Sequence, residues 1–156
     1  MFRPMRRIGQ ALYAEELDRV LTQAPRGVLA VHGEDGYPYA FPMDFLYLEG
    51  KLYFHCAKAG HKLDALRADD RVSFCVMDEG YRREGEWALN IRSVVIFGRV
   101  GKVDDPDRAR HIARLLGLKY YPSAQDVEIE LEKAMDRVQI LELTIDHMTG
   151  KLVNES

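Results

Sequence analysis

Residues 53–67, with the sequence YFHCAKAGHKLDALR, place two histidines, one cysteine and two lysines around a single glycine. Such side chains can bind a metal, bind an anion or move a proton. We expect no metal site. Successive side chains of a strand point to opposite faces, so His55 and Cys56 on one strand cannot reach the same ion. His61 lies beyond the glycine, and no further cysteine or histidine stands at a ligand-like spacing.

An anion site fits this stretch better. Gly60 precedes His61 and Lys62 at the start of a predicted helix over 61–69, where free backbone N–H groups and the positive end of the helix dipole attract anions. Basic side chains are unfavourable at this end of an isolated helix. With Lys58, three of them fall within five residues, and a phosphate would turn this charge to advantage. The alternative is that both lysines are solvated surface residues and His61 caps a neighbour.

The surrounding pattern predicts an α+β fold. Short runs rich in Val, Ile, Phe and Tyr, separated by turn signals, predict antiparallel strands. The predicted strands lie within 26–32, 37–49, 51–57, 71–78, 87–103 and 137–153, and the predicted helices are 14–24, 61–69, 105–117 and 126–136. Pro38 and Pro42 suit an edge strand or a bulge. We therefore expect a small antiparallel β-barrel of about six strands, closed or partly closed, with packed helices.

The composition fits one soluble domain spanning residues 1–156. A net charge of −3 gives no electrostatic basis for binding nucleic acid or an anionic membrane. The apolar runs are strand-length, far below the ~20 residues of a membrane span, and the first residues contain no apolar signal core. Cys56 and Cys75 lie inside apolar runs and are interpreted as reduced thiols, so a cytoplasmic location is expected.

A stretch from about residue 26 to 103 resembles a known family. The motifs that carry the resemblance are EDGYPY, PMDFLY, LYFHCAKAGHKLD, RVSFCV and RSVVIFGRV, in this order. Together they resemble the FMN-binding split-barrel flavoproteins related to pyridoxamine 5′-phosphate oxidase, and look most like the nitroimidazole-resistance (Nim-type) branch. This resemblance implies a split β-barrel and a homodimer with two FMN sites at the subunit interface.

The resemblance also implies which residues bind FMN. Those expected to line the flavin ring are Pro42, Met43, Asp44 and Phe45. Those expected at the ribityl-phosphate are Cys56 and Ala57, followed by His61, Lys62 and Leu63 at the phosphate itself. Arg92 and Ser93, with Trp87, are candidates to reach a flavin across the interface. For Phe45 and Tyr47 the alternative is an ordinary place in the barrel core, where aromatic rings are common.

His55 is the candidate catalytic residue, because imidazole readily delivers protons near neutral pH. A structural histidine is the alternative. The resemblance implies an FMN-dependent oxidoreductase that takes electrons from NADH or NADPH and reduces a small planar acceptor such as a nitroimidazole. No GxGxxG fingerprint is present, so the nicotinamide would bind transiently at the flavin face.

Three observations keep other functions open. The tail DHMTGKLVNES lacks the basic, tryptophan-containing segment of pyridoxamine 5′-phosphate oxidases proper, which argues against that reaction. Haem-handling relatives share this barrel, and His55 or His147 could be an axial ligand of a non-catalytic flavin- or haem-binding module. A flavin reductase that supplies reduced FMN to a partner is the third possibility.

Overall fold

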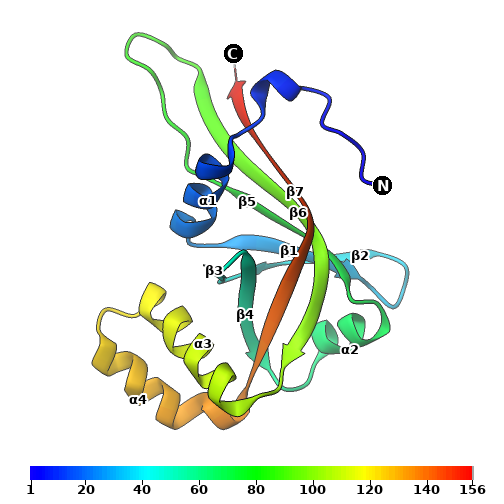
Figure 1. The fold of residues 1–156 in the computed structure, drawn as a ribbon, viewed down its shortest axis with the longest axis vertical. Helices are drawn as coiled ribbons and strands as arrows, with labels where there is room; N and C mark the ends of the chain where they lie inside the picture. The colour runs from blue at the N-terminus through cyan, green and yellow to red at the C-terminus, as the bar shows by residue number, and fades with distance from the viewer. Residues whose placement is uncertain (156) are drawn as a thin grey trace.

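One antiparallel sheet organises the protein. The computed structural model describes residues 1–155, and in this part of the chain seven strands follow the order β2-β1-β5-β6-β7-β4-β3 (Figure 1). The strands are β1 (Gly27–His32), β2 (Pro38–Met43), β3 (Leu46–Leu48), β4 (Lys51–Ala57), β5 (Arg71–Met77), β6 (Leu89–Val103) and β7 (Val138–Glu155). The α-helices are α1 (Ala14–Gln23), α2 (His61–Ala68), α3 (Pro106–Tyr120) and α4 (Ala124–Ala134), with short 3-10 helices at Ile8–Gln10 and Met135–Arg137.

The two long strands β6 and β7 join the halves of the sheet. They pair along almost their whole length and cross the full height of the molecule in Figure 1. A register shift between Phe97 and Gly98 bends the pair. Gly98 suits this bend, because a Cβ atom there would lie 2.3 Å from the carbonyl oxygen of Thr144. β5, β1 and β2 continue the sheet beyond β6, and β4 and β3 continue it beyond β7.

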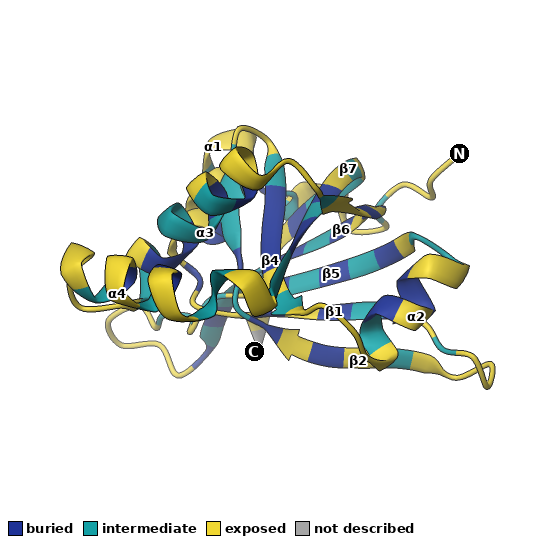
Figure 2. Cartoon of the chain, turned by 90° about the horizontal axis from the view of Figure 1, so that it is seen from below, coloured by how far each residue is buried: buried dark blue, intermediate teal, exposed yellow. Residues whose placement is uncertain are grey.

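The core lies inside the curve of the sheet and is centred on three fully buried phenylalanines. The Phe74 ring meets the rings of Phe45 and Phe54 edge-on, with centroids 5.1 and 5.3 Å apart. A smaller apolar cluster, centred on Tyr53 and Ile112, packs β4 against α3. The outward sides of the helices are mostly exposed, while buried residues alternate along the strands with half-buried or exposed ones (Figure 2).

Local signals explain the helix boundaries. Asp105 caps α3 by accepting a hydrogen bond from the Arg108 amide, and Pro106 occupies the first helical position. Ser123 caps α4 in the same way through the Asp126 amide. None of the described helices is long and apolar enough to cross a bilayer.

The α+β class and the antiparallel barrel-like sheet are confirmed, with two differences in detail. The sheet is not closed, since β2 and β3 remain its two outer strands. The predicted run 37–49 divides into β2 and β3 because Phe45 turns into the core, which adds a seventh strand. The helix α2 lies between β4 and β5 in the chain, and β4 pairs with β7. Pro38 and Pro42 lie on an edge strand, as predicted.

Candidate functional site

The split in the sheet lies between β2 and the far half of β4. β3 pairs with β4 only at Lys51–Tyr53. In the described part of the chain, residues 54–57 therefore pair with β7 alone, and their other edge is open. β2 likewise pairs only with β1. Backbone groups of both strands are thus free to bind a ligand at this split.

The start of α2 lies beside this open edge. Gly60 is the N-cap, with φ at 139°, and offers no side chain to cap the helix. The first helical hydrogen bond runs from the Asp64 amide to the Gly60 carbonyl, at 3.1 Å. The amides of residues 61–63 consequently lack acceptors within the helix. They face a cavity of about 200 Å³, lined by Tyr39, Cys56, Ala57, Ala59, Gly60, His61, Lys62 and Leu63.

Side chains of α2 reach across the split to β2. The His61 ring stacks on Tyr39, with centroids 4.2 Å apart. The Lys62 ammonium lies 4.6 Å from the centre of the Phe41 ring and 3.8 Å from the Met43 sulfur. Among the described ion pairs none involves Lys62, so its charge has only soft, neutral neighbours. Free amides, one cation and one imidazole suit a phosphate monoester, which could bind here without displacing an ion pair.

Cys56 forms an apolar wall of this cavity. Burial raises the pKa of its thiol, while the nearby Lys62 and Lys102 act in the opposite direction. The thiol is therefore protonated near neutral pH and is a poor nucleophile. Its neighbour Ala57 is exposed at the end of β4. Both positions suit contact with an aliphatic chain rather than covalent chemistry.

A second cavity lies against the other face of β4. His55 and Asp44 line it together with residues of α3 and α4, and its volume is about 250 Å³. Asp44 forms an ion pair with Arg26 at 2.9 Å. Because successive side chains of a strand alternate, His55 and Cys56 line different cavities. This arrangement agrees with the predicted opposite orientation of the two residues.

The remaining predicted site residues are dispersed. Pro42 is exposed on the edge strand, whereas Met43 is buried beneath Lys62. The Phe45 side chain is fully buried, in the core position that was the alternative prediction. Arg92 contacts Glu16 of α1 at 3.9 Å and Asp78, just after β5, at 3.3 Å.

Ser93 lies on the outer face of the sheet, opposite Met77 and Lys151 on the neighbouring strands. The described chain therefore gathers the predicted phosphate residues at one cavity and Asp44 with His55 at the other. Arg92 and Ser93 lie apart from both cavities.

Sequence reasoning missed Lys119 and Tyr120 in the last turn of α3. The Lys119 ammonium donates hydrogen bonds to the carbonyls of Ala24 and Phe45, both at 2.8 Å, and lies 3.9 Å from the centre of the Phe45 ring. The Tyr120 hydroxyl accepts a hydrogen bond from the Phe45 amide at 2.9 Å and donates to Pro25 at 2.7 Å. These contacts fix the corner between β2 and β3. No local pattern signals them, because the partners are about 75 to 95 residues away.

The environment of Lys119 predicts a pH-dependent stability. Burial lowers its pKa from 10.5 to about 8, while Asp44 acts in the opposite direction. Below pH 8 the folded and unfolded chains both carry the charge, so the folded state bears the full cost of burying it. Between pH 8 and pH 10.5, the pKa values of Lys119 in the folded and unfolded chains, the folded chain binds fewer protons than the unfolded chain. The contribution of Lys119 to the free energy of unfolding therefore rises with pH over this window.

We expect the unfolding free energy of the wild type, minus that of Lys119→Met, to rise by on the order of 1–2 kcal/mol from pH 8 to pH 10.5. Urea unfolding at several pH values measures this difference. A constant difference over the window would contradict the prediction.

Comparison with known proteins places the chain in a family. The profile described as pyridoxamine 5′-phosphate oxidase matches residues 13–152. The protein therefore belongs to this family, and the resemblance inferred from the motifs is confirmed. No curated protein sequence matches the chain.

Solved structures share the fold over nearly the whole chain. A candidate 5-nitroimidazole antibiotic resistance protein from Bacteroides thetaiotaomicron is 20% identical, with a TM-score of 0.76 over 92% of this chain and 87% of that one. A FAD-binding protein from Mesorhizobium loti is 26% identical, with a TM-score of 0.69 over 92% and 97%. A FAD- and haem-binding protein from Mycobacterium smegmatis is 25% identical, with a TM-score of 0.73 over 92% and 72%.

Proposed function

We propose that this protein is an FMN-dependent oxidoreductase that acts as a homodimer. It would take electrons from NADH or NADPH and reduce a small planar acceptor such as a nitroimidazole. The observation that carries the proposal is the cavity at the start of α2, where the amides of residues 61–63 and the Lys62 ammonium face an open split. Membership of the pyridoxamine 5′-phosphate oxidase family and the similar flavin-binding structures support a flavin as the ligand.

Each part of the site has a physical role in this proposal. Two-electron chemistry would be supplied by the bound flavin. The amides at the start of α2, with His61 and Lys62, bind the phosphate, and Cys56 and Ala57 pack against the ribityl chain. Pro42, Met43 and Asp44 border the ring. Phe45 acts indirectly, because its buried side chain and its bonded backbone hold this segment in place.

His55 is the proposed proton donor to the acceptor. It is exposed on β4 beside the open edge and shares a cavity with Asp44. From this position the imidazole would hold a proton for an acceptor bound at the open edge, while the residues proposed to hold the phosphate line the other cavity. General acid catalysis of this kind typically contributes about 10²–10⁴-fold to a rate.

A non-catalytic flavin- or haem-binding module is the second candidate, favoured by the similar structure of the FAD- and haem-binding protein. Of the two histidines considered as axial ligands, His55 is the accessible one. The His147 ring is stacked on Phe2, with centroids 4.7 Å apart, so Phe2 would have to move before haem could bind there.

Absorption spectra and turnover separate these candidates. Purified protein, or protein reconstituted with FMN, is expected to show the absorbance of a bound oxidised flavin, whereas haem would give a Soret band. The holoprotein should then oxidise NADH or NADPH faster with a nitro compound than free FMN does. Protein that binds no flavin under either condition would refute the proposal, and flavin binding without this acceleration would favour the binding module.

The outer face of the sheet is the proposed dimer interface. Val28, Cys75 and Val95 form a row across β1, β5 and β6. Val28, Met77 and Phe97 are 45%, 61% and 41% exposed, which is high for apolar side chains on a sheet. Ser93 lies on the same face of β6 as Val95, so it would belong to this interface.

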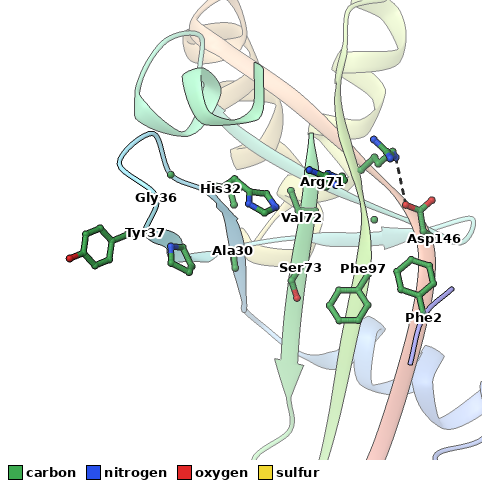
Figure 3. A pocket seen from close by; sticks show the side chains of 15 residues that line it. Phe2, Ala30, His32, Gly36, Tyr37, Arg71, Val72, Ser73, Phe97 and Asp146 are labelled. Atoms are coloured by element: carbon green, nitrogen blue, oxygen red, sulfur yellow. Dashed lines mark ion pairs between the residues drawn. The ribbon is translucent and has the colours of Figure 1, made fainter. Parts of the chain in front are cut away.

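A cavity of about 460 Å³ continues this face toward the β1–β2 turn (Figure 3). Phe2 and Phe97 form one side of it, stacked with centroids 5.6 Å apart. Its cations are already paired: Arg71 with Asp69 at 2.6 Å, and Arg99 with Asp146 at 3.8 Å. An extra anion would find little free charge here, so apolar contact with a second copy is the better use of this surface.

Val95→Arg should abolish this dimer. Burying an unpaired guanidinium in an apolar interface costs several kcal/mol, more than most modest interfaces can offset. Wild-type protein is expected to elute with twice the mass of the 17.9 kDa chain, and the variant with that of one chain and with weaker FMN binding. Leu118→Arg, at an exposed position of α3, is the control. A monomeric wild type would contradict the interface.

A further inference from the structure

The cavity between β4 and the α3–α4 pair is a mostly apolar pocket that is open to solvent on one side. Leu116, Val127 and Leu131 are almost completely buried, yet their side chains border its open volume. The only polar side chains of its lining belong to Asp44, His55, Glu130, Tyr120 and Tyr121. We propose that this pocket is the acceptor site and that it selects small, uncharged, single-ring compounds. This inference rests on the proposed function, because it assigns the substrate class of that flavin site.

The size of the pocket sets the size of the ligand. Its volume is about 250 Å³. An apolar cavity of about 150 Å³ is enough for benzene, and pockets for drug-sized ligands begin at about 300 Å³. The available space therefore suits one ring with one or two small substituents. A second fused ring or a nucleotide would extend out of the pocket.

Gly117 and a set of ion pairs hold α3 against α4. Gly117 lets the two helices approach closely, since a Cβ atom at this position would lie 3.0 Å from Val127. On the outside, Arg110 pairs with Glu132 at 2.7 Å, and Arg114 pairs with Glu128. The helices thus hold each other without filling the space over β4.

The charges around the pocket disfavour anions. Asp44 and Glu130 bring two carboxylates to its lining, against the single imidazole of His55. Arg26 neutralises Asp44 at 2.9 Å, but no described cation pairs with Glu130. A neutral ring can bury its apolar surface here, whereas an anionic ring would meet an unpaired carboxylate.

The pocket also has the correct position for transfer from a flavin. Asp44 belongs to the segment proposed to border the flavin ring, and it lines this pocket directly. His55 lines it from β4, next to the open edge. A ring bound in this pocket would therefore lie beside Asp44 and His55, the residues proposed to border the flavin and to donate the proton.

Ala113→Leu is the decisive variant, because it fills the pocket from α3 without changing charge. With FMN-loaded protein we expect the KM for the neutral probe 4-nitrobenzyl alcohol to rise at least about 10-fold, which corresponds to 1.4 kcal/mol. The KM for NADH and the Kd for FMN should stay unchanged. In wild type the anionic probe 4-nitrobenzoate should have the higher KM of the two probes. Ala68→Leu, the same change on the exposed end of α2, is the control.

A second measurement does not depend on flavin or turnover. Titrating flavin-free protein with 4-nitrobenzyl alcohol should shift the amide NMR signals of Ala113 and Gly117. If Ala113→Leu does not fold, Ala134→Leu takes its place as the pocket-filling variant, and it should abolish these shifts. Shifts elsewhere, or equal KM values in wild type and variant, would overturn the acceptor site. Failure of the protein to bind flavin would instead refute the proposed function, and the two failures are therefore distinguishable.

Discussion

Replacing Lys62 with glutamine is expected to weaken FMN binding by about 10- to 100-fold and to leave riboflavin binding unchanged. A hydrogen bond to a charged group contributes about 1.5–3 kcal/mol, which corresponds to this range. The effect should be large because the Lys62 ammonium has only Phe41 and Met43 as close partners. Its charge is therefore available to the phosphate, which riboflavin lacks.

Lys58→Gln is the matched control for this experiment. Lys58 belongs to the same basic stretch, but it lines a different cavity, next to α3 and α4. Isothermal titration with FMN and with riboflavin should give a change of less than about twofold for this variant, as for most exposed charges. Equal losses in both variants would mean that only the general positive charge matters. A loss of riboflavin affinity in Lys62→Gln would place the lysine at the ring instead of the phosphate.

Replacing Phe74 with alanine should cost about 3–5 kcal/mol of unfolding free energy, the typical range for a fully buried phenylalanine. Its ring joins Phe45 and Phe54 through edge-on contacts and also lies directly over Gly27. No nearby side chain is free to fill the space, since this region is closely packed. The variant would therefore leave a cavity at the centre of the core.

Urea unfolding followed by circular dichroism measures this loss. Tyr37→Ala removes another aromatic ring, but from an exposed turn, and should change stability by no more than about 0.5 kcal/mol. If Phe74→Ala lowers the unfolding free energy by less than about 1.5 kcal/mol, the stability of the sheet does not depend on the cluster of three phenylalanines.

Much of the fold could be predicted because its signals are local. Proline and capping residues end the helices near the predicted positions, and the break at Tyr121-Pro122 separates α3 from α4. The prolines of β2 predicted an edge strand or a bulge, and the sheet order shows an edge strand. The period of two along β4 predicted that His55 and Cys56 point to opposite faces, and they line different cavities.

Features that depend on distant partners could not be predicted. β4 pairs with β7, whose residues lie more than 80 positions further along the chain, and no pattern within either strand specifies this choice. The corner at Phe45 depends on Lys119 and Tyr120. The pocket against α3 and α4 likewise arises only when the helix pair packs across β4. A sequence pattern can indicate an anion-binding helix start, but not the space beside it.

The place of β7 between β6 and β4 has a consequence for synthesis on the ribosome. Because β7 follows β4 and β6 in the chain yet lies between them in the sheet, neither neighbour can complete its pairing until β7 has left the exit tunnel. The emerging chain carries an unpaired edge of β4, and later one of β6, until then, and such edges invite aggregation. Nascent chains stalled before residue 138 should therefore be bound by chaperones and cleaved readily by protease, and both properties should disappear once β7 is released.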